Sequence, residues 1–71
     1  MTRTPVVSTD IASIGYSEAD RTLEVEFVRG ERVFVYRAVE PDMYKRLMSA
    51  NSIGAFFREH IRSNYGHEEV K

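Results

Sequence analysis

Hydrophobic and polar residues alternate most regularly in the stretch RTLEVEFV, residues 21 to 28. Leu23, Val25 and Phe27 occupy every second position, and threonine and glutamate fill the positions between them. A period of two is typical of a β-strand that buries one face and exposes the other. The pattern therefore predicts a strand whose apolar face packs against the rest of the protein.

Two further stretches predict strands that pair with this one. Residues 11 to 17 (IASIGYS) precede a polar turn, and residues 32 to 39 (RVFVYRAV) are rich in β-branched and aromatic side chains. We expect the three strands to form an antiparallel meander. A four-residue link over 17 to 20 predicts three facing pairs: Ile14 with Leu23, Tyr16 with Arg21, and Ala12 with Val25.

The second hairpin is compatible with two registers, because its glycine suits turns of different length. A two-residue turn puts Phe34 and Tyr36 on the apolar face, whereas a three-residue turn puts Val33 and Val35 there. We favour the two-residue turn, since burying an aromatic side chain contributes roughly 1.5 to 3 kcal/mol. The outward face then carries Val28, Val33 and Val35.

Helical periodicity follows the strands. Pro41 is suited to a first helical turn, and apolar residues at i, i+3 and i+4 predict a helix over 41 to 50. Asn51 or Ser52 can cap a second helix. That helix is predicted over 53 to 65 by six residues at helical spacing: Ile53, Phe56, Phe57, His60, Ile61 and Tyr65.

The element order predicts an α+β fold, β-β-β-α-α, with a three-stranded antiparallel meander and two helices packed on one face. We expect one domain over 11 to 66, with flexible segments at 1 to 10 and 67 to 71. The 71 residues include no cysteine, so disulfides cannot stabilise the small core. Neither a membrane-spanning run nor a signal-peptide core is present in the sequence, and we expect a cytoplasmic protein.

Five short motifs in these elements resemble the KTSC family. They are IGY (14 to 16), LEVEF (23 to 27), FVY (34 to 36), V-x-P-x-x-Y (39 to 44) and SIGAFFREHIRSNY (52 to 65). The last is similar to the family pattern S-x-G-x-[FY]-F…I-R…Y. KTSC domains are named for the C-terminus of certain lysyl-tRNA synthetases, and also occur as free-standing small bacterial and phage proteins.

The sequence departs from the family pattern at three places. Phe34 stands where the family commonly has tyrosine, Arg58 where it often has asparagine, and the loop around Gly30 is one residue longer. For KTSC domains RNA binding has been suggested. The resemblance therefore implies the fold and a binding role more than any reaction.

Basic residues on the two helices are candidates for binding RNA phosphates. Arg58 and Arg62 are i, i+4 neighbours on the expected outward side of the second helix, and Lys45 and Arg46 lie on the first. A formal net charge of −1 provides no global attraction for nucleic acid, so binding must come from this local patch. Ordinary solvation, or pairing with Glu59, is the competing interpretation.

A protein partner is the alternative. Val28, Val33 and Val35 would form an exposed apolar strip beside an unpaired edge strand, which suits a partner or a second copy of the chain. Such a protein could be a monomer or a sheet-mediated homodimer acting as a small phage or bacterial regulator or inhibitor. The aromatic residues are expected to form the core rather than to stack on bases.

Catalysis is not expected. His60 with Ser49, or with Glu59 and Ser52, lacks a carboxylate placed to orient the imidazole. His60 and His67 are not part of a metal-binding spacing motif. We therefore expect a non-enzymatic module without a metal ion or cofactor.

Overall fold

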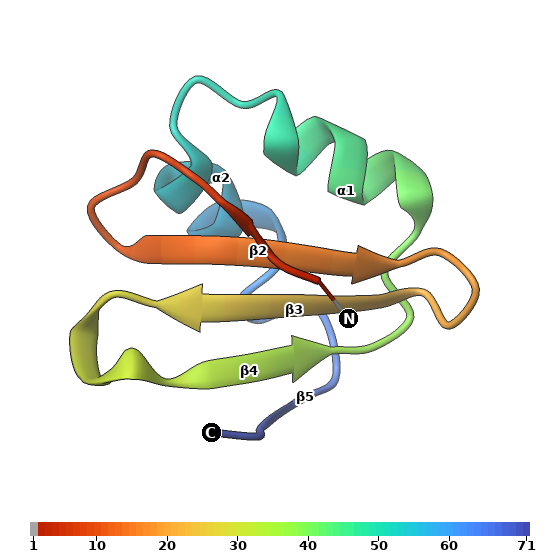
Figure 1. Ribbon diagram of the computed structural model, residues 1–71. Helices are drawn as coiled ribbons and strands as arrows, with labels where there is room; N and C mark the ends of the chain where they lie inside the picture. The colour runs from red at the N-terminus through yellow and green to blue at the C-terminus, as the bar shows by residue number, and fades with distance from the viewer. Residues whose placement is uncertain (1) are drawn as a thin grey trace.

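A computed structural model describes residues 2–71 as one sheet with two α-helices on one of its faces (Figure 1). The strands are antiparallel and follow chain order, β1-β2-β3-β4-β5. The elements are β1 (Thr4–Pro5), β2 (Ile11–Ser17), β3 (Thr22–Phe27), the 3-10 turn η1 (Arg29–Glu31), β4 (Val33–Tyr36), α1 (Pro41–Met48), α2 (Ile53–His60) and β5 (His67–Glu69). The α+β class, the antiparallel sheet and the two helices agree with the sequence-based prediction.

The prediction of three strands was wrong, because both terminal segments add a strand to the sheet. β1 and β5 are short, and all their residues are exposed. Their pairing depends on backbone hydrogen bonds, such as those of Val33 N–H to Lys71 O and of Val70 N–H to Val33 O, both 2.8 Å. Exposed polar strands of two or three residues have no hydrophobic alternation, so the pattern could not reveal them.

The first hairpin has the predicted faces but a different register. Ile14 lies opposite Val25 and Tyr16 opposite Leu23, because the four-residue link covers 18 to 21 instead of 17 to 20. In addition, an irregularity between Ile11 and Ser13 shifts the pairing. This β-bulge brings Ile11, rather than Ala12, onto the buried face.

The second hairpin has the favoured register. Tyr36 lies opposite Leu23 and Phe34 opposite Val25, so both aromatic side chains share the apolar face. The connection is nevertheless a four-residue loop, closed by a 2.8 Å hydrogen bond from Phe27 N–H to Arg32 O. A four-residue loop keeps the same face alternation as a two-residue turn. Its sharp reversal uses the positive φ of Gly30, +74°.

The core lies between the sheet and the helices. Phe57 of α2 is 3% exposed and makes edge-to-face contacts with Tyr36 and Phe27, with ring centroids 5.3 and 5.6 Å apart. At the other end of the sheet, Tyr16 stacks on Tyr44 of α1 at 4.6 Å. The aromatic side chains thus hold both helices on the sheet. The expectation that they form the core is met by Tyr36 and Phe57, whereas Phe27 and Phe34 are only half-buried.

The second helix is shorter than predicted. Ser52 caps α2 by accepting a 3.2 Å hydrogen bond from Ala55 N–H, and the helix ends at His60 instead of residue 65. Beyond it, the N–H groups of Ile61 and Arg62 both donate to Phe57 O at 2.9 Å. This tight turn ends the regular helix, and Arg62 consequently lies in the segment that follows it.

Candidate functional site

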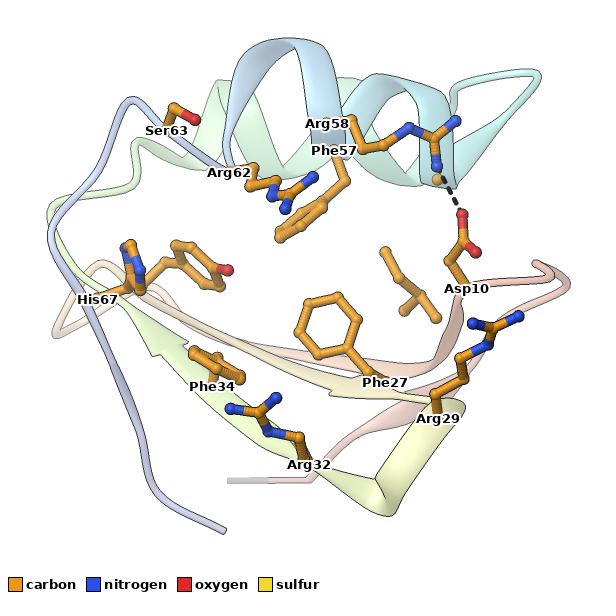
Figure 2. Close-up of a pocket in the computed structure, with 13 residues that line it drawn as sticks. Asp10, Phe27, Arg29, Arg32, Phe34, Phe57, Arg58, Arg62, Ser63 and His67 are labelled. Carbon is orange, nitrogen blue, oxygen red and sulfur yellow. Dashed lines mark hydrogen bonds and ion pairs between the residues drawn. The ribbon is translucent and has the colours of Figure 1, made fainter.

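A cleft of about 660 Å³ lies between α2 and the apolar face of β3 and β4. Figure 2 shows side chains from both layers pointing into this space, with Phe57 and Arg62 on the helix side and Phe27 and Phe34 on the sheet side. The cleft is lined by Asp10, Ile11, Phe27, Arg29, Arg32, Phe34, Tyr36, Gly54, Phe57, Arg58, Arg62, Ser63 and His67. Its volume is in the range of small-ligand sites in proteins.

The floor of the cleft is aromatic. Phe27 and Phe34 are half-buried and meet edge to face at 5.6 Å. Tyr36 and Phe57, each 3% exposed, continue the same cluster into the core. The cleft is therefore the place where the aromatic core reaches solvent.

Arginines surround this aromatic floor. Four of them line the cleft, together with a single carboxylate among the described lining residues, that of Asp10. Arg58 donates to Asp10 at 2.5 Å, and Arg32 donates two hydrogen bonds to Glu69 at 2.7 and 2.8 Å. Within residues 2–71, Arg29 and Arg62 make no ion pair. A concave, locally positive surface thus exists on a protein whose formal net charge is −1.

The Tyr36 hydroxyl adds a polar group to the cleft. The residue is almost fully buried, yet its hydroxyl makes no hydrogen bond to another group in the described part of the chain. Burial raises the pKa of Tyr36 above its ordinary value of 10.0, and the neighbouring Arg62 charge partly opposes this. The hydroxyl accordingly keeps its proton at neutral pH and is available to donate a hydrogen bond.

The structure divides the four basic residues that the sequence suggested. Arg58 and Arg62 both line the cleft, although Arg62 does so from beyond the end of α2 and not from its outward side. Lys45 and Arg46 lie in the last turn of α1 and do not line it. The Arg46 guanidinium is instead 5.5 Å from the ring centroid of Phe56. Of the four residues, Arg58 and Arg62 therefore line the cleft, whereas Lys45 and Arg46 lie outside it.

Sequence reasoning missed the sheet side of the cleft. Arg29 lies within the four-residue loop and Arg32 follows it, and both line the cleft. The Arg32 guanidinium carbon lies 5.3 Å from the Phe34 ring centroid. His67, assigned to a flexible tail, packs 5.0 Å from the Tyr36 ring. In the sequence, only the favoured register of the second hairpin could have indicated that these residues lie close together.

The expected strip of exposed valines is not formed. Val33 is 2% exposed, whereas Val28 is 49% exposed and Val35 is half-buried. Moreover, β4 is not an edge strand, because β5 pairs with it along Val35 and its neighbours. Backbone pairing of the chain's own C-terminus removes the open edge that the three-strand prediction required.

Of the other candidate groups, His60 lies beside Glu59 and Phe56. His60 packs 4.4 Å from the Phe56 ring, with its Nε2 3.7 Å from a Glu59 carboxylate oxygen.

In the described chain, histidine, aspartate and glutamate side chains form no cluster of three or more that could hold a metal ion. No helix within residues 2–71 has the length and apolar character needed to cross a membrane.

The architecture defines a small α+β domain with a five-stranded antiparallel sheet and two helices on one face. Residues 7–65 match the family model of the KTSC domain. The crystal structure of a KTSC domain protein from Yersinia pestis superposes with a TM-score of 0.94 and 33% identity, covering 99% of this chain and 97% of that one. An uncharacterised protein of Stutzerimonas stutzeri (strain A1501) is 36% identical over 59 residues, 83% of this chain and 82% of that protein. The chain belongs to the KTSC domain family.

Proposed function

We propose that this KTSC domain is a non-enzymatic module that binds single-stranded RNA in the cleft between α2 and the sheet. The observation that carries the proposal is the combination of four arginines with the half-buried rings of Phe27 and Phe34 in one concavity. Sites for single-stranded nucleic acid combine these two elements, because phosphates need cations and bases need flat apolar contacts. Arginines scattered over a solvated surface would lack this aromatic contact area for bases.

The shape of the site favours an unpaired strand. A base can contact Phe27 or Phe34 only when it is unstacked, since both rings lie inside the cleft. The bases of a duplex are already stacked and paired. The opposite sheet face is less suited to phosphates, because it carries Glu24 and Glu26, and Arg3 is already bonded to Glu24 there.

Binding through the sheet is the second candidate and has lost its main support. It required an exposed Val33 and an unpaired edge on β4, but Val33 is 2% exposed and β5 occupies that edge. A protein partner would have to pair with one of the two short edge strands instead, β1 or the charged β5. Charged residues on short edge strands act against such pairing.

Fluorescence anisotropy with a labelled eight-nucleotide RNA, measured from 25 to 200 mM salt, tests RNA binding. Of the four arginines that line the cleft, Arg29 and Arg62 make no ion pair in the described chain, so two phosphate contacts are expected. The logarithm of the association constant should then fall with the logarithm of salt with a slope of roughly −1.4.

Two double variants that each remove two positive charges distinguish RNA binding in the cleft from a general effect of charge. Arg29→Ala with Arg62→Ala should abolish most binding, whereas Lys45→Ala with Arg46→Ala should retain it, because the second pair lies outside the cleft. Circular dichroism establishes that both variants are folded. Absence of RNA binding at 25 mM salt, or equal losses in the two folded double variants, would refute the proposal.

A further inference from the structure

Most of the polar groups available to a base in the cleft are hydrogen-bond donors, although Ser63 and His67 also line it and can accept. Arginine guanidinium groups only donate, and Arg29 and Arg62 have no ion-pair partner within residues 2–71. The one carboxylate in the described lining, that of Asp10, already accepts a hydrogen bond from Arg58. The cleft therefore has more free hydrogen-bond donors than free acceptors.

Tyr36 is the donor best placed to act on a base rather than on a phosphate. Its residue is 3% exposed, its hydroxyl is unpartnered within the described chain, and it belongs to the same aromatic cluster as Phe34, 6.5 Å away between ring centroids. In the described chain no fully buried side-chain oxygen lacks a hydrogen-bond partner, so the unpartnered Tyr36 hydroxyl keeps contact with the solvent of the cleft and can be reached by a ligand there.

We propose that the cleft holds one unstacked nucleotide unit and prefers keto bases over amino bases, with the Tyr36 hydroxyl donating to the base carbonyl and Arg62 binding the phosphate. This inference rests on the proposed RNA-binding function and adds the base selectivity. Uracil presents the O4 acceptor where cytosine presents the N4 amino donor. The arginines can pair with the first and not with the second. A hydroxyl can also accept, so the preference requires the Tyr36 hydroxyl to be oriented as a donor.

Uracil and cytosine make a sharp test, because the two pyrimidines differ in this edge but have similar size and stacking surface. The probes are labelled oligomers U8 and C8, and unlabelled UMP and CMP as competitors. One hydrogen bond predicts roughly 2- to 12-fold tighter binding of U8 than of C8. Competition by UMP at concentrations where CMP is inactive would show that the free nucleotide unit carries the preference, whereas a preference confined to U8 would assign it to the strand; both support the base selectivity.

Tyr36→Phe tests the assigned residue while keeping the ring. The variant should bind C8 as the unaltered protein does and should lose the preference for U8. Tyr65→Phe is the matched control, because Tyr65 does not line the cleft, and it should keep the preference. Circular dichroism and urea unfolding verify that both variants are folded.

The outcomes separate this inference from the proposed function. Binding of U8 and C8 with equal affinity, or an unchanged preference in folded Tyr36→Phe, would overturn the keto-base site while leaving RNA binding intact. Absence of binding to either oligomer at 25 mM salt would overturn both.

Discussion

The guanidinium of Arg58 donates a hydrogen bond to the carboxylate of Asp10 at 2.5 Å, which connects α2 with the segment before β2 across 48 residues of sequence. Gly54 lies beside this pair, and a Cβ there would be 3.1 Å from the Asp10 carboxylate. The two side chains are 51% and 52% exposed. An exposed pair contributes about 0 to 1 kcal/mol, so its main effect is on the charge of the cleft.

Asp10→Asn should therefore strengthen RNA binding. The substitution removes a negative charge from the rim of the cleft and leaves Arg58 available to a phosphate. Between solvent-exposed groups, one such charge interaction amounts to about 1 kcal/mol or less, which predicts a roughly two- to fivefold gain in affinity. Anisotropy titrations at fixed salt measure the gain, and weaker binding by the folded variant would contradict the role of Asp10.

The two adjacent phenylalanines of α2 should differ in their effect on stability. Phe57 is 3% exposed between Tyr36 and Phe27, so Phe57→Ala should lower the free energy of unfolding by about 3 to 5 kcal/mol. A domain of this length has a total of only about 4 to 11 kcal/mol. Phe57→Ala is accordingly expected to be largely unfolded at moderate urea concentrations.

Phe56→Ala is the control for this prediction. Phe56 is half-buried and contacts Arg46 and His60, so its loss should cost clearly less than the loss of Phe57. Urea unfolding of the two variants gives the comparison. Equal destabilisation would show that the packing assigned to α2 is wrong.

Deletion of residues 67 to 71 should destabilise the domain and promote self-association. Without β5, the edge of β4 is unpaired and Val33 loses the backbone segment that pairs with it. An unpaired edge strand is a template for pairing with another chain. Sedimentation analysis over a concentration range should detect the additional association, relative to the full chain.

The full-length variant Glu68→Gln with Glu69→Gln tests whether backbone pairing is the cause. It removes the ion pairs with Arg37 and Arg32 but leaves the strand in place. It should keep the oligomeric state of the unaltered chain. If it associates as the truncated chain does, the ion pairs rather than the strand protect the edge.

Alkaline pH should destabilise the domain in part through Tyr36. Burial raises the pKa of Tyr36 above 10.0 in the folded protein, so the folded state favours the protonated phenol more strongly than the unfolded state does. This contribution is constant below about pH 10 and is lost as the pH rises from the unfolded pKa through the folded pKa.

Urea unfolding from pH 7 to 11 measures the alkaline loss, with Tyr36→Phe as the comparison. The variant should lose less stability between pH 10 and 11 than the unaltered protein. The pKa of Tyr16 is also raised by burial, so some tyrosine dependence should remain in the variant. Identical pH profiles would exclude Tyr36 as a contributor.

The sequence by itself predicted most of the side chains that face the core, although it left the register of the second hairpin open and placed Ala12 where Ile11 lies. Alternation along β3 and the two aromatic residues of β4 predict the buried face, and the spacing of Phe56, Phe57 and Ile61 predicts the contact side of α2. These signals are readable because burial of large apolar side chains dominates the stability of the fold, and it imposes a period on the sequence. The sequence also identified Arg58 and Arg62 as candidate binding residues, but it did not show the cleft in which they lie.

Tertiary structure alone decided the extent of the sheet and the existence of the cleft. β1 and β5 pair through backbone groups, which every residue possesses, so their short polar sequences have no distinctive pattern. The cleft requires Arg29, Arg32 and Arg62 to converge from a loop and a helix end. Their convergence depends on loop length and on where α2 stops, and both are set by hydrogen bonds and packing between segments far apart in the chain.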